Sequence, residues 1–216
     1  MKKSLLAAAI AAATVLFAAP ASATLLTGTL AVDNEFQAYF STNNGAQGSL
    51  ITSGNNWQTT YSLSQAMTAG QSGYLHIVAH NTGGPGGFLG AFAFSDSNFK
   101  FANGTQSLLT GDSAWTYNTT GWTNTGNQWF TPVNEGTEGV SPWGTVPALA
   151  NANPTWIWNY VSNTGNDTNT LYFSAKLISN GNGTADATGN VPEPASLALF
   201  GLGIAGIAAM RKRRVA

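Results

Sequence analysis

The chain has 216 residues, no cysteine and a formal net charge of −1, and it is long enough to form a sizeable core without disulfides. Most of its positive charge lies near the two ends. Residues 24–190 contain only two bases, Lys100 and Lys176, and eight acidic residues, a net charge of −6. Because nucleic acids and anionic lipids are bound by clustered Lys and Arg, we expect no nucleic-acid partner for this part.

The first 23 residues have the three parts of an export signal. A positive start (MKK) precedes an apolar stretch (SLLAAAIAAATVLFAA), and PASA ends in a cleavage site of small residues. We predict cleavage after Ala23 and export of the remaining chain. The alternative, an uncleaved membrane anchor, needs about 20 apolar residues and no such site.

Residues 24–178 are predicted to form one all-β domain. Short apolar or alternating runs are separated by Gly, Asn, Ser and Thr, a spacing typical of a sandwich or barrel. The strands are expected at 25–32, 35–41, 57–63, 73–80, 87–95, 113–118, 155–160 and 170–178. We expect the large side chains of Trp115, Trp156 and Trp158 in the core.

Few residues of this domain have the pattern of a catalytic or metal site. On a strand, His76 and His80 are separated by about 13 Å, too far to share one ion, so a structural role is expected. Glu135 and Glu138, in NEGTEG, are possible paired carboxylates for acid–base work on a sugar. Their Gly-rich segment, predicted as a solvated loop, offers nothing to raise either pKa. We therefore expect no enzyme.

Asp33 and Asn34 are the best candidates for a Ca²⁺ site, because carboxylate and amide oxygens suit this ion. The alternative is that the pair closes a turn through its own backbone, which these residue types often do. Asp96, in SDSN, has the same ambiguity. No metal is predicted, and Ca²⁺ at Asp33 and Asn34 is left open.

Three tryptophans lie in polar segments that are suited to sugar binding. Trp122 and Trp129 are in TGWTNTGNQWF, and Trp57 is in GNNWQTT. Sugars pack their apolar C–H faces on flat exposed rings and need polar neighbours for their hydroxyls. Trp57, Trp122 and Trp129 are therefore candidate carbohydrate-binding residues, with burial in the core as the alternative.

Five blocks of the domain follow an order that resembles galactose-binding-like jelly-roll domains. They are AVDNEFQAYF, GNNWQTTYSL, GYLHIVAHNTGGPGGFLGAFAF, SAWTY and WIWNY…NTLYFSAKL, spread over 30–178. The resemblance implies a jelly-roll-like β-sandwich and a carbohydrate ligand. The segment 41–54 is longer than the short turn at this place in such domains.

After the domain come a linker and a segment in three parts. Residues 179–190 are rich in Gly, Asn and Thr and are predicted to be a flexible linker. The first part of the segment at 191–214 is Val191, Pro192, Glu193 and Pro194. An apolar stretch at 195–210 follows, about 24 Å long as a helix, and the last part is Arg211, Lys212, Arg213 and Arg214. We expect one transmembrane helix with the basic cluster inside and the domain outside.

These three parts in this order resemble the PEP-CTERM sorting signal of Gram-negative bacteria. The resemblance implies recognition by exosortase, a membrane-embedded enzyme, with transient anchoring in the inner membrane and release to the cell surface or extracellular matrix. It also implies an association with exopolysaccharide. We therefore expect a surface protein that binds extracellular polysaccharide. The alternatives are a structural or adhesive matrix protein without a small ligand, and a secreted enzyme.

Overall fold

The computed structural model describes residues 23–123, 128–159 and 169–180. Almost all of the predicted signal peptide, most of the linker and the segment at 191–214 lie outside these residues. The described part contains strands and no helix that is long and apolar enough to cross a membrane. The prediction of an all-β fold is confirmed for this part.

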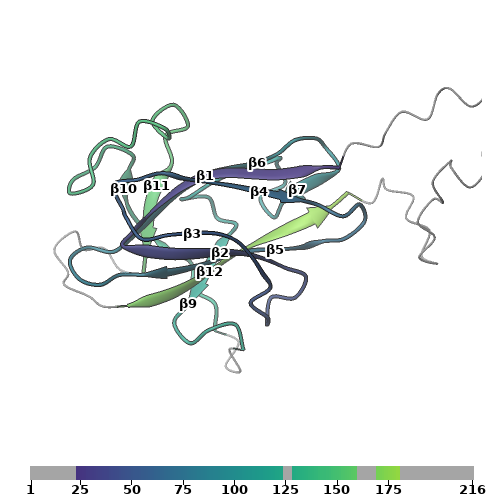
Figure 1. Ribbon diagram of the computed structural model, residues 1–216, viewed down its shortest axis with the longest axis horizontal. Coiled ribbons are helices and arrows are strands. Elements are labelled where there is room, and N and C mark those ends of the chain that lie inside the picture. Colours follow the sequence, from purple (N-terminus) through teal and green to yellow (C-terminus); the bar gives the residue numbers. More distant parts are fainter. Residues whose placement is uncertain (1–22, 124–127, 160–168, 181–216) are drawn as a thin grey trace, which may run out of the picture.

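In the part of the chain that the structure describes, twelve strands form two antiparallel sheets that pack face to face (Figure 1). The strands are β1 (Leu25–Asp33), β2 (Glu35–Ser41), β3 (Ser49–Gly54), β4 (Tyr61–Ala66), β5 (Gly73–His80), β6 (Gly87–Phe94), β7 (Phe99–Phe101), β8 (Ser107–Leu109), β9 (Trp115–Asn118), β10 (Val133–Thr137), β11 (Thr155–Trp158) and β12 (Thr170–Ser179). The first sheet has the order β10-β11-β6-β1-β4, with β8 also paired to β6. The second has the order β3-β2-β5-β12-β7, with β9 also paired to β12.

The main core lies between the sheets and follows from the alternation of each strand. Leu75, Ile77 and Ala79 of β5 point inward and are fully buried, and β12 does the same with Leu171 and Phe173. Successive side chains of a strand point to opposite faces. The intervening residues of β5 and β12 therefore form the outer face of the second sheet.

A smaller core covers the outer face of the first sheet. Ala31 and Leu89 pair across β1 and β6 and point away from the main core, together with Trp156. Residues 138–154, which we call the covering segment, place Trp143 on them, with the rings of Trp143 and Trp156 centred 4.5 Å apart. This segment is the green loop that lies over β10 and β11 in Figure 1. Trp115, Trp156 and Trp158 are all buried, as expected, but Trp156 belongs to this second core.

Candidate functional site

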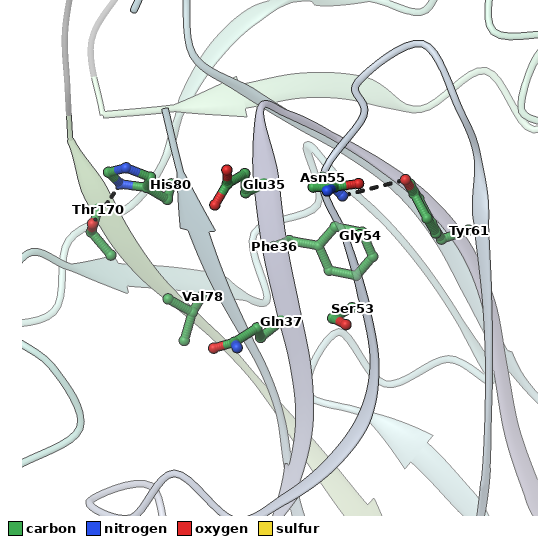
Figure 2. A pocket seen from close by; sticks show the side chains of 10 residues that line it. All are labelled: Glu35, Phe36, Gln37, Ser53, Gly54, Asn55, Tyr61, Val78, His80 and Thr170. Carbon is green, nitrogen blue, oxygen red and sulfur yellow. Dashed lines mark hydrogen bonds between the residues drawn. The ribbon is translucent and has the colours of Figure 1, made fainter. Parts of the chain in front are cut away.

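The outer face of the second sheet carries a hollow of about 540 Å³ (Figure 2). Strand register brings its residues together: Glu35 pairs with His80 and His80 with Thr170, while Gln37 lies between Ser53 and Val78. Because paired residues of neighbouring strands share a face, these six side chains point outward together. The complete lining is Glu35, Phe36, Gln37, Ser53, Gly54, Asn55, Tyr61, Val78, His80 and Thr170.

Hydrogen bonds fix part of this lining. His80 Nδ1 lies 2.9 Å from Thr170 Oγ1, and the Tyr39 hydroxyl donates to Gln37 Oε1 over 2.7 Å. The second bond leaves the Nε2 hydrogens of Gln37 for another acceptor. Glu35 and Gln37 are exposed, and His80 is half-buried. The hollow therefore presents a carboxylate, an amide and an imidazole to solvent in a partly fixed arrangement.

The lining suits hydrogen bonding to a ligand better than metal coordination. Glu35 and His80 are the two side chains of the hollow that prefer metals. In the part of the chain that the structure describes, no group of three or more His, Cys, Asp or Glu could hold an ion. Amide and hydroxyl groups can donate hydrogen bonds to a ligand rich in hydroxyls or accept them from it, and a carboxylate can accept them.

Beside the hollow, a buried histidine, His76, lies on the same outer face. His76 is fully buried; its Nε2 lies 3.1 Å from Asn44 Oδ1 and its Nδ1 lies 3.3 Å from Gln47 O. Burial lowers the pKa of His76 to about 4, although the Gln47 carbonyl opposes this shift. A neutral imidazole donates only one hydrogen bond, so an N–H to Gln47 requires Asn44 to turn its amide NH₂ toward Nε2.

Trp122 lies on this histidine and is not an exposed ring. The two ring centroids are 3.9 Å apart with 12° between the planes, and the Trp122 and Tyr172 rings form a T-shaped pair with centroids 5.3 Å apart. Only 8 % of Trp122 is exposed. The expectation of an exposed platform at Trp122 is therefore wrong, because its ring packs against His76, Tyr172 and Trp129.

The three candidate tryptophans do not form one site. Trp129 is half-buried and stacks on Trp122 with centroids 6.4 Å apart. Trp57 is also half-buried but packs against the second core on the other sheet. Sugar binding by Trp57, Trp122 and Trp129 stays a prediction, with accessible ring surface at Trp57 and Trp129 only.

Glu135 and Glu138 do not lie in a solvated loop. Glu135 is in strand β10, and the Glu138 carboxylate accepts a hydrogen bond from the backbone N–H of Val146. This bond ties the start of the covering segment to its middle. The contact favours a structural role for Glu138. The sequence predicted a loop here because NEGTEG contains glycine and acidic residues, which are unusual in a strand.

The side-chain oxygens of Asp33 and Asn34 accept hydrogen bonds from distant segments, and these contacts are not the turn through their own backbone that the sequence offered as the alternative to a Ca²⁺ site. Asp33 is 7 % exposed, and its Oδ2 accepts a 2.9 Å hydrogen bond from Trp143 Nε1. Asn34 Oδ1 accepts from the backbone N–H and the hydroxyl of Thr82. Burial raises the pKa of the Asp33 carboxyl, and the Trp143 hydrogen bond lowers it by less. Asp96 accepts from Thr24 and from the Asn98 backbone.

The polar residues of the hollow were missed by sequence reasoning. Glu35 and Gln37 alternate with buried residues in a predicted strand, which is a weak signal for an outward face. Thr170 lies 90 residues after His80. Only the pairing of β5 with β12, which no local pattern gives, brings these two residues together.

Comparison with known protein families finds the PEP-CTERM protein-sorting motif at residues 190–214. No curated protein and no solved structure matches the chain. The expected likeness to galactose-binding-like jelly rolls therefore stays a prediction beyond the two-sheet sandwich itself. The chain carries a PEP-CTERM sorting motif, which implies an exported protein that is processed by a membrane-embedded exosortase.

Proposed function

We propose that this exported chain is a non-catalytic surface or matrix module that binds extracellular polysaccharide in the hollow at Glu35, Gln37 and His80. One observation carries the proposal. Hydrogen-bonding side chains from β2, β3, β5 and β12 meet in one hollow together with the half-buried, apolar side chain of Val78. Ligand sites combine such apolar walls with a few polar groups that fix orientation.

The net charge of the domain indicates whether a neutral or a charged glycan fits it better. Residues 24–190 carry a net charge of −6, so a strongly anionic polymer would be repelled at low salt. A neutral, hydroxyl-rich polysaccharide is the ligand that this balance favours. The association of PEP-CTERM proteins with exopolysaccharide, expected from the resemblance, supports a polysaccharide as the ligand.

A structural or adhesive matrix protein without a small ligand is the second candidate. It is favoured by the burial of five of the seven tryptophans, among them Trp122 and Trp143, whose rings pack in stacks on the outer faces of the sheets. Rings buried in this way stabilise the sandwich and leave little aromatic surface for sugars.

A glycan array with the full chain separates the two candidates. The protein is kept in a detergent without a sugar headgroup, which would otherwise compete. We expect binding to neutral glycans and a loss of about fivefold for Gln37→Ala or His80→Ala, since one hydrogen bond contributes about 1 kcal/mol. Ser64→Ala, at an exposed position of β4 in the first sheet, is the control. Absence of binding to every glycan supports the structural role instead.

A further inference from the structure

A second hollow of about 440 Å³ lies between the covering segment and the β3–β4 connection. Two indoles line it: Trp57, which is half-buried, and Trp143, which is 6 % exposed. Their polar neighbours are amides and hydroxyls. The complete lining is Trp57, Gln58, Thr60, Trp143, Thr145, Val146, Pro147 and Ala148.

The Trp143 wall of this hollow is held from behind. Its Nε1 donates to the buried carboxylate of Asp33 over 2.9 Å, and its ring stacks on Trp156 at an interplanar angle of 17°. A Cβ at Gly87 would come within 2.8 Å of both indole rings, so glycine is what allows the stack to approach β6. The wall is therefore fixed before any ligand arrives, which lowers the entropic cost of binding.

The other wall is fixed by its own turn. The backbone N–H of Gln58 donates to Asn56 Oδ1, and that of Thr59 donates to Asn56 O. This turn sets the direction of Trp57 and Gln58 beside the covering segment. Both walls are thus built by hydrogen bonds within the domain.

The chemistry of the lining favours one class of ligand. The half-buried Trp57 indole offers a flat surface for the C–H face of a sugar, and Gln58, Thr60 and Thr145 can bond its hydroxyls. None of the eight lining residues is charged. An ionic group in this hollow would lose water without gaining a partner, so a neutral sugar fits better than an acidic one.

The two hollows are neighbours along the chain. Asn55 lines the first and Trp57 lines the second. Consecutive Cα atoms are about 3.8 Å apart, so the Cα atoms of Asn55 and Trp57 are separated by at most about 7.6 Å. The β3–β4 connection thus joins the two hollows, and a polymer strand that bends around it can reach from the hollow on the second sheet into the one beside the first sheet.

We propose that the Trp57–Trp143 hollow is an uncharged saccharide subsite, and that one polysaccharide strand occupies it together with the hollow at Glu35 and Gln37. This inference rests on the proposed function. It adds a second point of contact and predicts that affinity rises with the length of the glycan, because a long strand engages both hollows.

Affinity electrophoresis tests the inference with the full chain in a detergent without a sugar headgroup. The gels contain dextran, galactomannan or hydroxyethyl cellulose, three neutral polysaccharides. We expect the retaining polymer to bind Trp57→Ala about five- to tenfold more weakly, in line with about 1 kcal/mol for an aromatic contact. Gln58→Ala, at an exposed position, removes a polar contact and leaves the second core in place. Phe130→Ala, an exposed ring on the other sheet, is the matched control.

The outcomes separate this inference from the proposed function. Weaker retention of Trp57→Ala and Gln58→Ala, with Phe130→Ala unchanged and long fragments of the polymer bound more tightly than short ones, supports the subsite. Weaker retention of Gln37→Ala alone leaves the proposed function standing and overturns the subsite. If the wild-type chain is retained by none of the three polymers, both proposals fail.

Discussion

The Trp122 indole lies face to face on the His76 imidazole, with ring centroids 3.9 Å apart and an angle of 12° between the planes. One residue comes from strand β5 and the other from the segment after β9. The stack fixes this segment on the outer face of the second sheet. It also explains how a polar sequence can bury a tryptophan.

Replacing Trp122 is expected to destabilise the domain more than replacing Trp129. Trp122 is 8 % exposed and contacts His76, Tyr172 and Trp129, while Trp129 is half-buried. We expect Trp122→Ala to lower the free energy of unfolding by about 3 kcal/mol, the lower end for buried Trp→Ala changes. For Trp129→Ala the loss should be about 1 kcal/mol. Urea unfolding measures both, and equal losses would contradict the buried position of Trp122.

The stability of the domain should fall as the pH is lowered from about 6.5 toward 4. The pKa of His76 is lowered from 6.5 to about 4 in the folded state. In this window the unfolded chain binds a proton that the folded chain does not, so acid favours unfolding. The loss is on the order of 3 kcal/mol over the whole window.

The pH dependence is measured by urea unfolding of the wild type and of His76→Gln. The variant should show a much smaller loss between pH 6.5 and 4. Asp33 acts in the opposite direction: its raised pKa makes the folded state bind protons more tightly, so its contribution to stability rises as the pH falls. An unchanged slope in His76→Gln would show that other groups cause the loss.

The two-sheet fold could be predicted from alternation, but four strands could not. The predicted strands at 35–41 and 73–80 agree with β2 and β5 in both bounds. Four short strands were missed: β3, β7, β8 and β10. In β3 and β10 the alternation is weak, because most side chains are exposed or half-buried. The run predicted at 57–63 was displaced, since residues 57–59 form a turn and β4 begins at Tyr61.

The candidate sites depended on contacts between distant segments. Trp122 was expected to be exposed because its neighbours in sequence are polar. Its burial comes from contacts with His76, 46 residues earlier in the sequence, and with Tyr172, 50 residues later. Likewise, the sequence around Asp33 predicted a turn or a Ca²⁺ site. The hydrogen-bond partner of Asp33 is instead Trp143, which lies 110 residues away. Local patterns contain no information about such pairs.

Trp143→Phe is expected to destabilise the covering segment. Phenylalanine keeps an aromatic ring against Trp156 but removes the Nε1–H that bonds to Asp33. The other oxygen of this buried carboxylate, Oδ1, already has no partner in the described structure. Leaving Oδ2 without one should cost about 1–3 kcal/mol. Chemical unfolding measures the loss.

The double variant tests whether the loss comes from the carboxylate. Asp33→Asn removes the charge, so in Trp143→Phe it should recover part of the stability. The loss of stability caused by Trp143→Phe is therefore measured in the wild type and in Asp33→Asn. Equal losses would show that packing of the indole, and not its hydrogen bond, holds the covering segment.

Replacing Pro192, Glu193 and Pro194 with alanine should hold the protein in the membrane as an uncut precursor. The PEP-CTERM protein-sorting motif matches residues 190–214, which include this stretch, the apolar run and the basic cluster. Two prolines oppose a helix, so the sequence predicts an extended stretch before the apolar run. An enzyme can bind such a stretch. Alanine favours helix and would remove this feature.

Cell fractionation with intact-mass measurement follows the outcome: the wild type should be released without Arg211 and the bases after it. Thr184→Ala, in the predicted linker, is the control. Normal release of the triple variant would show that the motif is not what the sorting enzyme reads.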